Sequence, residues 1–165
     1  MFSLLSACQW LEGTEWSIAI HESQWVYPAI ESIHVLGLCL FVGSTLVMDL
    51  RLVGVALRRA PILKVVAQLA PWIRGGFVVM LVSGALLFST TPVKFYGNVF
   101  FQAKAVMLLL AGTNAWLFHR RAAHLTDAER ADGTVPGARL AGTISLVLWT
   151  GIVTSGRMVA YNWFN

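Results

Sequence analysis

Several ionisable side chains interrupt the long apolar stretches of this sequence. They are Glu31, His34, Asp49, Lys104, His119 and Arg157. A charged group inside hydrocarbon costs several kcal/mol, so each of these positions requires a partner or a function. A neutral imidazole can ligate a metal ion or haem iron, and a buried amine can lose its proton or pair with a carboxylate. A guanidinium group pairs with carboxylates, including haem propionates near a membrane face.

The spacing of these residues places them at two depths. His34 and Asp49 are separated by about 22 Å along a helix, and so are Lys104 and His119. In helices that cross a membrane, this spacing predicts an outer level with His34 and Lys104, which Arg157 joins from the last apolar stretch. Asp49 and His119 then share an inner level.

The outer level predicts a cofactor site. We expect His34, Lys104 and Arg157 to hold one b-type haem, with His34 and Lys104 as candidate metal ligands and Arg157 near the propionates. The alternative for His34 is a hydrogen-bonded contact between helices without any ligand. Glycines are frequent in the apolar stretches, where they permit close helix approach or leave room for a flat macrocycle.

The inner level allows two interpretations. His119 is a further candidate metal ligand, but an interfacial His119 that pairs with Asp49 is the favoured interpretation. Asp49 and Arg51 are expected to form an ion-pair network that holds helix ends. Asn98 and Asn114 are expected to make hydrogen bonds between helices.

Four apolar stretches must position these residues. Of the 165 residues, 57% are hydrophobic and only 12% are charged, about half the charged fraction of a soluble domain. This composition predicts an all-α membrane protein, a bundle of four transmembrane helices that forms a single domain over residues 1–165. The expected spans are 28–57, 73–89, 100–118 and 140–161.

Basic residues gather around the first and third connections between the expected spans. They are Arg51, Arg58, Arg59, Lys64, Arg74, Arg120, Arg121, Arg130 and Arg139. Residues 1–30 contain no lysine or arginine, and the second connection contains only Lys94. The positive-inside rule therefore predicts that both termini lie outside, in the periplasm for the inner membrane of a bacterium. The net charge of +4 is explained by membrane orientation, so no nucleic-acid partner is expected.

The first 27 residues combine indole rings with acidic side chains, a mixture typical of a membrane interface. The aromatic members are Trp10, Trp16, Trp25 and Tyr27, and the acidic ones are Glu12, Glu15 and Glu22. We expect an amphipathic helix at the outer interface, with a lid packed on the bundle as an equally favoured alternative.

Three blocks of the sequence resemble a known but uncharacterised family of small bacterial four-helix membrane proteins. These blocks are WVYPAIESIHVLGLCLFVGSTLVMDLRLVG, FFQAKAVMLLLAGTNAWLFH and LWTGIVTSGRMVAY. More distantly, the pattern is similar to the haem-b-dependent membrane protoporphyrinogen oxidase, in which a histidine of the first span and a lysine that opens the third match His34 and Lys104. That resemblance implies haem ligation at these two residues. The run IHVLGLCLFVG is also similar to the membrane domain of copper-resistance protein D, which implies copper handling at the outer face.

The leading hypothesis is a membrane haem-b protein that transfers electrons or acts as an oxidoreductase on a small molecule. The second is a copper-handling membrane protein that uses His34 with Met48, Met80 or Met158 as soft ligands. The third is a structural or assembly subunit without a cofactor. Expected partners are the lipid bilayer, further copies of the chain in a homo-oligomer, and a redox partner or quinone.

Overall fold

The computed structural model describes residues 4–125 and 135–161, and every regular element in these ranges is a helix. Four helices are long and apolar enough to cross a membrane: α3 (Val26–Val53), α4 (Ile62–Thr90), α6 (Val99–Ala123) and α8 (Ala138–Tyr161), the last through its segment Ala138–Val159. Three short helices accompany them: α1 (Leu4–Glu12), α2 (Glu15–Glu22) and α5 (Pro92–Gly97). The predicted all-α fold with four candidate spans is confirmed.

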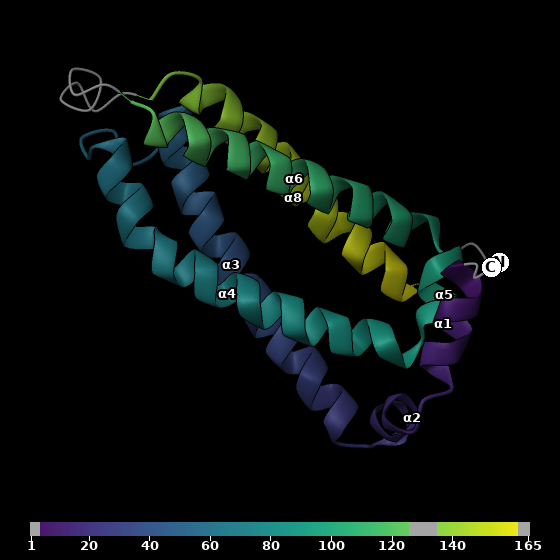
Figure 1. Ribbon diagram of the computed structural model, residues 1–165. Helices are drawn as coiled ribbons and strands as arrows, with labels where there is room; N and C mark the ends of the chain where they lie inside the picture. The colour runs from purple at the N-terminus through teal and green to yellow at the C-terminus, as the bar shows by residue number, and fades with distance from the viewer. Residues whose placement is uncertain (1–3, 126–134, 162–165) are drawn as a thin grey trace.

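The four spans form two antiparallel pairs. α3 packs along α4, and α6 packs along α8, while contacts between α3 and α8 join the two pairs (Figure 1). The outward faces of all four helices carry exposed aliphatic side chains, of which Leu109 on α6 is 74% exposed. Helices satisfy their own backbone hydrogen bonds, so such a surface is stable in hydrocarbon but not in water. The fold is therefore suited to contact with a lipid bilayer.

The tightest apolar packing lies where α3 ends and α4 begins, which we call the basic end because the clustered arginines lie there. The buried members of this core are Leu52, Ile62, Phe118, Leu125, Val135 and Ala138. Gly54 ends α3 with a φ of 88°, a left-handed conformation that glycine adopts without a Cβ penalty. The chain can therefore turn at once toward α4, whose first residue Ile62 enters the same core.

The helix that carries the second expected span begins before residue 73. A proline inside a helix removes one backbone hydrogen bond and usually kinks or interrupts the helix. In the structure Pro71 lies inside α4, which begins at Ile62, and burial of Ile62 and Val65 stabilises the turns before the proline. The predicted end near Thr90 is confirmed, but Pro92 then opens the unpredicted helix α5, because proline suits the first turn of a helix.

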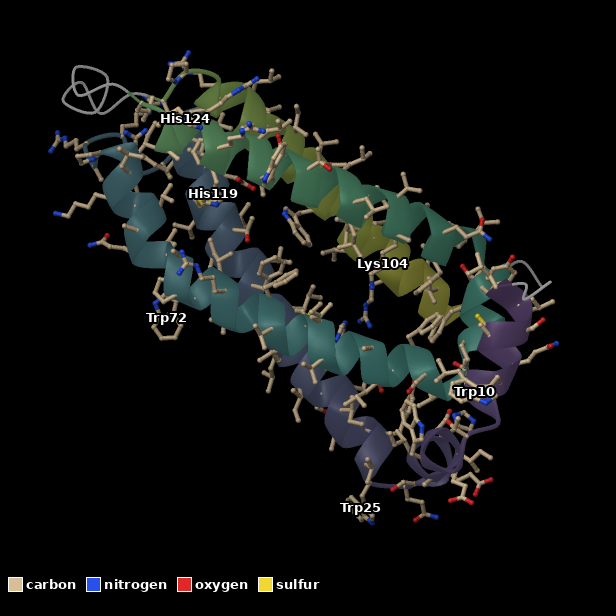
Figure 2. All side chains as sticks on the ribbon, in the orientation of Figure 1. Trp10, Trp25, Trp72, Lys104, His119 and His124 are labelled. Carbon is tan, nitrogen blue, oxygen red and sulfur yellow. The ribbon has the colours of Figure 1, made fainter. Side chains whose placement is uncertain are left out.

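The first two helices cover the opposite end of the bundle, which we call the capped end. α1 packs on α5, and α2 contacts both α3 and α4. The hydroxyl of Ser17 in α2 is fully buried and donates to the carbonyl oxygen of Ser89 at 2.5 Å. Trp10 and Trp25 remain exposed at this end (Figure 2). The N-terminal segment is thus two short helices that form a lid, the alternative that the sequence left open, and the lid presents indole rings outward.

Candidate functional site

His34 is held in one orientation by a serine of the neighbouring helix. Its Nδ1 lies 2.8 Å from Oγ of Ser83, on α4. The single hydroxyl proton of Ser83 is already donated to the carbonyl oxygen of Val79, at 2.5 Å. The serine oxygen must therefore accept from Nδ1–H, which places the imidazole proton on Nδ1. This tautomer leaves Nε2 with a free lone pair, as in histidines whose second nitrogen binds a metal.

A glycine next to Ser83 makes room for the imidazole ring. A Cβ atom at Gly84 would lie 3.2 Å from Cε1 of His34, closer than ordinary van der Waals contact. Further along the same interface, a Cβ at Gly76 would meet the Cα and backbone nitrogen of Phe41 at 3.0 Å. The α3–α4 pair therefore packs closely, and glycines on α4 accept groups carried by α3.

Lys104 approaches His34 from the other helix pair. Its half-buried side chain extends from α6 toward the α3–α4 pair (Figure 2). A Cβ at Gly156 of α8 would lie 3.5 Å from Nζ, in ordinary van der Waals contact, so the amine packs beside this glycine. Lys104 lies within electrostatic range of the imidazole of His34. We call these two residues the His34–Lys104 site.

Aromatic side chains flank the His34–Lys104 site along the helix axes. Toward the capped end, the rings of Phe88, Phe95 and Phe101 stack with centroids 5.3 to 6.0 Å apart. Toward the basic end, Phe41 meets Trp149 edge-on with centroids 4.9 Å apart. These rings were not among the residues predicted for the site. Phe88 and Phe101 could have been predicted from their helical spacing, because they lie about one turn from Gly84 on α4 and from Lys104 on α6.

Two of the predicted site residues do not join this pair. The side chain of Arg157 on α8 is exposed, although the adjacent residue Gly156 faces Lys104. His119 is also exposed, and its ring lies edge-on to that of Phe118 near the basic end. About fifteen residues of helix, or roughly 22 Å, separate it from Lys104. Of the candidate ligands among the described residues, His34 and Lys104 lie within electrostatic range of each other.

Asp49 is buried without a hydrogen bond or an ion pair to any described residue, so its predicted ion pairs with Arg51 and His119 were wrong. The residue is 1% exposed, and neither carboxylate oxygen makes a hydrogen bond with a described residue. The Ser145 hydroxyl on α8 is near enough to act on it, but outside hydrogen-bonding geometry. Arg51 donates instead from Nε to the carbonyl oxygen of Ala60 at 2.7 Å, because residues two apart lie on different sides of a helix. His119 is exposed and makes no hydrogen bond to the carboxylate.

The two asparagines differ in their roles. Nδ2 of Asn114 on α6 donates to the carbonyl oxygen of Ala141 on α8 at 2.9 Å, which confirms the predicted bond between helices. Asn98 instead caps the start of α6, where its Oδ1 accepts from the backbone N–H groups of Phe100 and Phe101. Asparagine is a favoured capping residue because a helix start leaves such N–H groups without partners.

The methionines do not gather around His34. Met48 packs against the apolar core of the basic end, and Met158 is exposed. Met80 lies beside Gly37, one turn along α3 from His34. No group of three or more His, Cys, Asp or Glu side chains that could hold a metal ion occurs among the described residues.

The structure is that of a multi-pass helical membrane protein. Its four long helices are apolar, and they expose aliphatic side chains on their outward faces. The chain belongs to a family of unknown function, DUF6644, whose sequence profile matches residues 17–162. No curated protein and no solved structure matches the chain. The resemblances to the haem-dependent oxidase and to copper-resistance protein D therefore find no support in these comparisons.

Proposed function

We propose that the protein binds one haem b at the His34–Lys104 site and acts in electron transfer or in the oxidation of a small molecule. The observation that carries this proposal is the oriented imidazole of His34. Its Nδ1–H is engaged by Ser83, its Nε2 is open, and a lysine from the other helix pair lies nearby. A structural histidine needs only one such bond, whereas a ligand needs the second nitrogen free.

Each residue of the site has a role in this proposal. Nε2 of His34 would bind the haem iron, and Ser83 holds the ring in the tautomer that leaves this nitrogen available. Lys104 would either bind the iron as well or neutralise a propionate. The rings of Phe88, Phe101 and other aromatic residues exclude water from the space between the pairs. When bound, haem supplies reversible one-electron chemistry.

The test is the absorption spectrum of protein purified in detergent from haem-replete cells. We expect a Soret band that shifts on reduction with dithionite and is absent in His34→Ala. His124→Ala is the matched control, because His124 is exposed at the basic end, far from the site (Figure 2). A colourless wild-type protein, or equal loss of the band in both variants, would reject the proposal.

The hydrogen bond from His34 to Ser83 gives a finer test of the same proposal. Ser83→Ala retains the imidazole but removes its orienting partner, so haem affinity should fall about 10- to 100-fold. Ser32→Ala is the control, since Ser32 is exposed and bonds only the carbonyl oxygen of Pro28 in its own helix. Unchanged haem affinity in Ser83→Ala would show that the tautomer does not matter for binding.

We further propose that the basic end faces the cytoplasm of a bacterium and that both termini are periplasmic, as the distribution of lysine and arginine indicates. The His34–Lys104 site then lies in the outer half of the bilayer, where a quinone or another redox partner can approach. The exposed apolar helix faces also suit association into a homo-oligomer. A reporter that is active only in the periplasm, fused after residue 165, should be active under this orientation and inactive under the reverse one.

A further inference from the structure

A hollow of about 490 Å³ opens at the basic end, beside the end of α3 and the start of α8. Its lining residues are Arg51, Val53, Gly54, Val55, Arg58 and Arg139. The three guanidinium groups come from α3, from the connection to α4 and from the first turn of α8. No carboxylate is among these lining residues. Because like charges repel, three arginines that line one hollow disfavour each other, and an anion between them would relieve the repulsion.

Two of the three guanidinium groups are held in place by backbone oxygens. Nε of Arg51 donates to the carbonyl oxygen of Ala60 at 2.7 Å, and Nε of Arg58 donates to that of Gly54 at 2.5 Å. A guanidinium group has five N–H donors in a planar fork, so each arginine keeps its terminal N–H groups for a ligand. This arrangement suits the bidentate recognition of a phosphate group.

The start of α8 strengthens the positive potential of the hollow. The helix begins at Ala138, and its first turn contains Arg139 and no acidic residue. A helix start carries partial positive charge and N–H groups without intrahelical partners, both of which favour anions. The nearest buried carboxylate, that of Asp49, makes no hydrogen bond to Arg51. The charge of the hollow is therefore not neutralised from within the described residues.

Apolar side chains beside the arginines indicate where the phosphate comes from. Val55 lines the hollow and is exposed, and Leu57 follows it in the same connection with its side chain also exposed. Guanidinium groups beside exposed aliphatic side chains match a phospholipid, whose headgroup and acyl chains are adjacent. We propose that this hollow binds the phosphate of an anionic phospholipid in the membrane leaflet at the basic end.

The experiment is native mass spectrometry of the detergent-purified protein with phosphatidylglycerol, phosphatidylcholine or inorganic phosphate. We expect phosphatidylglycerol to bind more tightly than phosphatidylcholine. Arg58→Gln and Arg139→Gln should each weaken that binding about fivefold, since one arginine near an anionic surface contributes roughly that factor. Arg59→Gln is the matched control, because Arg59 is exposed and adjacent in sequence but does not line the hollow.

Each outcome bears on the proposal. Weaker phosphatidylglycerol binding in the two hollow variants, with Arg59→Gln within twofold of the wild type, would support it. Equal losses in all three variants would assign the effect to net charge and overturn the specific site. Inorganic phosphate that competes fully with phosphatidylglycerol would overturn the lipid assignment and leave a free phosphate as ligand. Circular dichroism of each variant checks that the helices are retained.

Discussion

The two polar regions of the bundle are built differently. At the His34–Lys104 site, the polar groups come from separate helix pairs, and Gly84 on α4 leaves room for the imidazole ring of His34. Around Asp49, α3 and α8 are in close contact, and a Cβ at Gly142 would lie 3.0 Å from the carbonyl oxygen of Asp49. The basic end therefore contains the closest packing between α3 and α8, whereas His34 is held by a single hydrogen bond to Ser83.

The largest expected effect tests whether stability resides at the basic end. Leu52→Ala removes a side chain that is 4% exposed in the core and should lower the free energy of unfolding by about 2–5 kcal/mol. Leu109→Ala is the matched control, because Leu109 faces outward and its truncation should cost less than about 0.5 kcal/mol. Denaturant unfolding in detergent micelles measures both. Similar losses in the two variants would contradict the assignment of the core.

A glycine substitution tests how closely α3 and α8 approach. A Cβ at Gly142 would lie 2.8 Å from Cβ of Leu52, so Gly142→Ala forces the backbones apart at a cost of about 1–3 kcal/mol. At Gly112 a Cβ meets no atom within 4 Å, so Gly112→Ala should be neutral or stabilising by up to about 1 kcal/mol. Thermal unfolding of the two variants gives the comparison, and equal stability of Gly142→Ala and wild type would refute the close contact.

A glycine-to-alanine substitution at the His34–Lys104 site gives a direct comparison with Gly142→Ala. Gly84→Ala would crowd the imidazole ring of His34 rather than a backbone atom. Because a side chain can rotate away, the loss of stability should be smaller than for Gly142→Ala. The proposed haem affinity should fall, since the ring leaves its ligating position. Haem titration and thermal unfolding together measure this, and a fall in stability without a change in affinity would go against it.

A smaller effect is expected from the hydrogen bond within the second helix pair. Asn114→Ala removes the donor to the carbonyl oxygen of Ala141. It should lower the free energy of unfolding by about 0.6 kcal/mol, a typical value for hydrogen bonds between helices in membranes. Thr113→Ala serves as control, since Thr113 is exposed and bonds only Leu109 of its own helix. The variants are compared by denaturant unfolding in micelles. If Asn114→Ala lowered the free energy of unfolding as much as Leu52→Ala, the α6–α8 pair would depend on polar rather than apolar contacts.

The smallest effect is expected at Asp49, and it separates two descriptions of the region. If Asp49 were ion-paired, as the sequence suggested, removal of its charge would cost about 3–5 kcal/mol. Its oxygens lack hydrogen-bond partners among the described residues, and an unpaired buried carboxylate is itself costly, so the isosteric Asp49→Asn should be neutral or slightly stabilising. Denaturant unfolding of this variant in micelles measures the change. A decrease of several kcal/mol in the free energy of unfolding would show that Asp49 is ion-paired in the wild type.

The sequence alone predicted the four apolar helices and the interhelical hydrogen bond of Asn114. These features depend on hydropathy and on the rise and turn of a single helix, which follow from local sequence. α4 begins at Ile62, before the expected residue 73, because burial of Ile62 and Val65 in the tertiary structure stabilises its first turns.

Which polar groups are paired depends on how the helices pack against each other. Ser83 and Gly84 gained their roles from the way α4 packs on α3, and no spacing within α4 encodes that contact. Arg157 is exposed and Asp49 is unpaired because helix rotation and the choice of neighbouring helix set those outcomes. Depth in a membrane follows from position along one helix, whereas partnership requires knowing how the helices face each other.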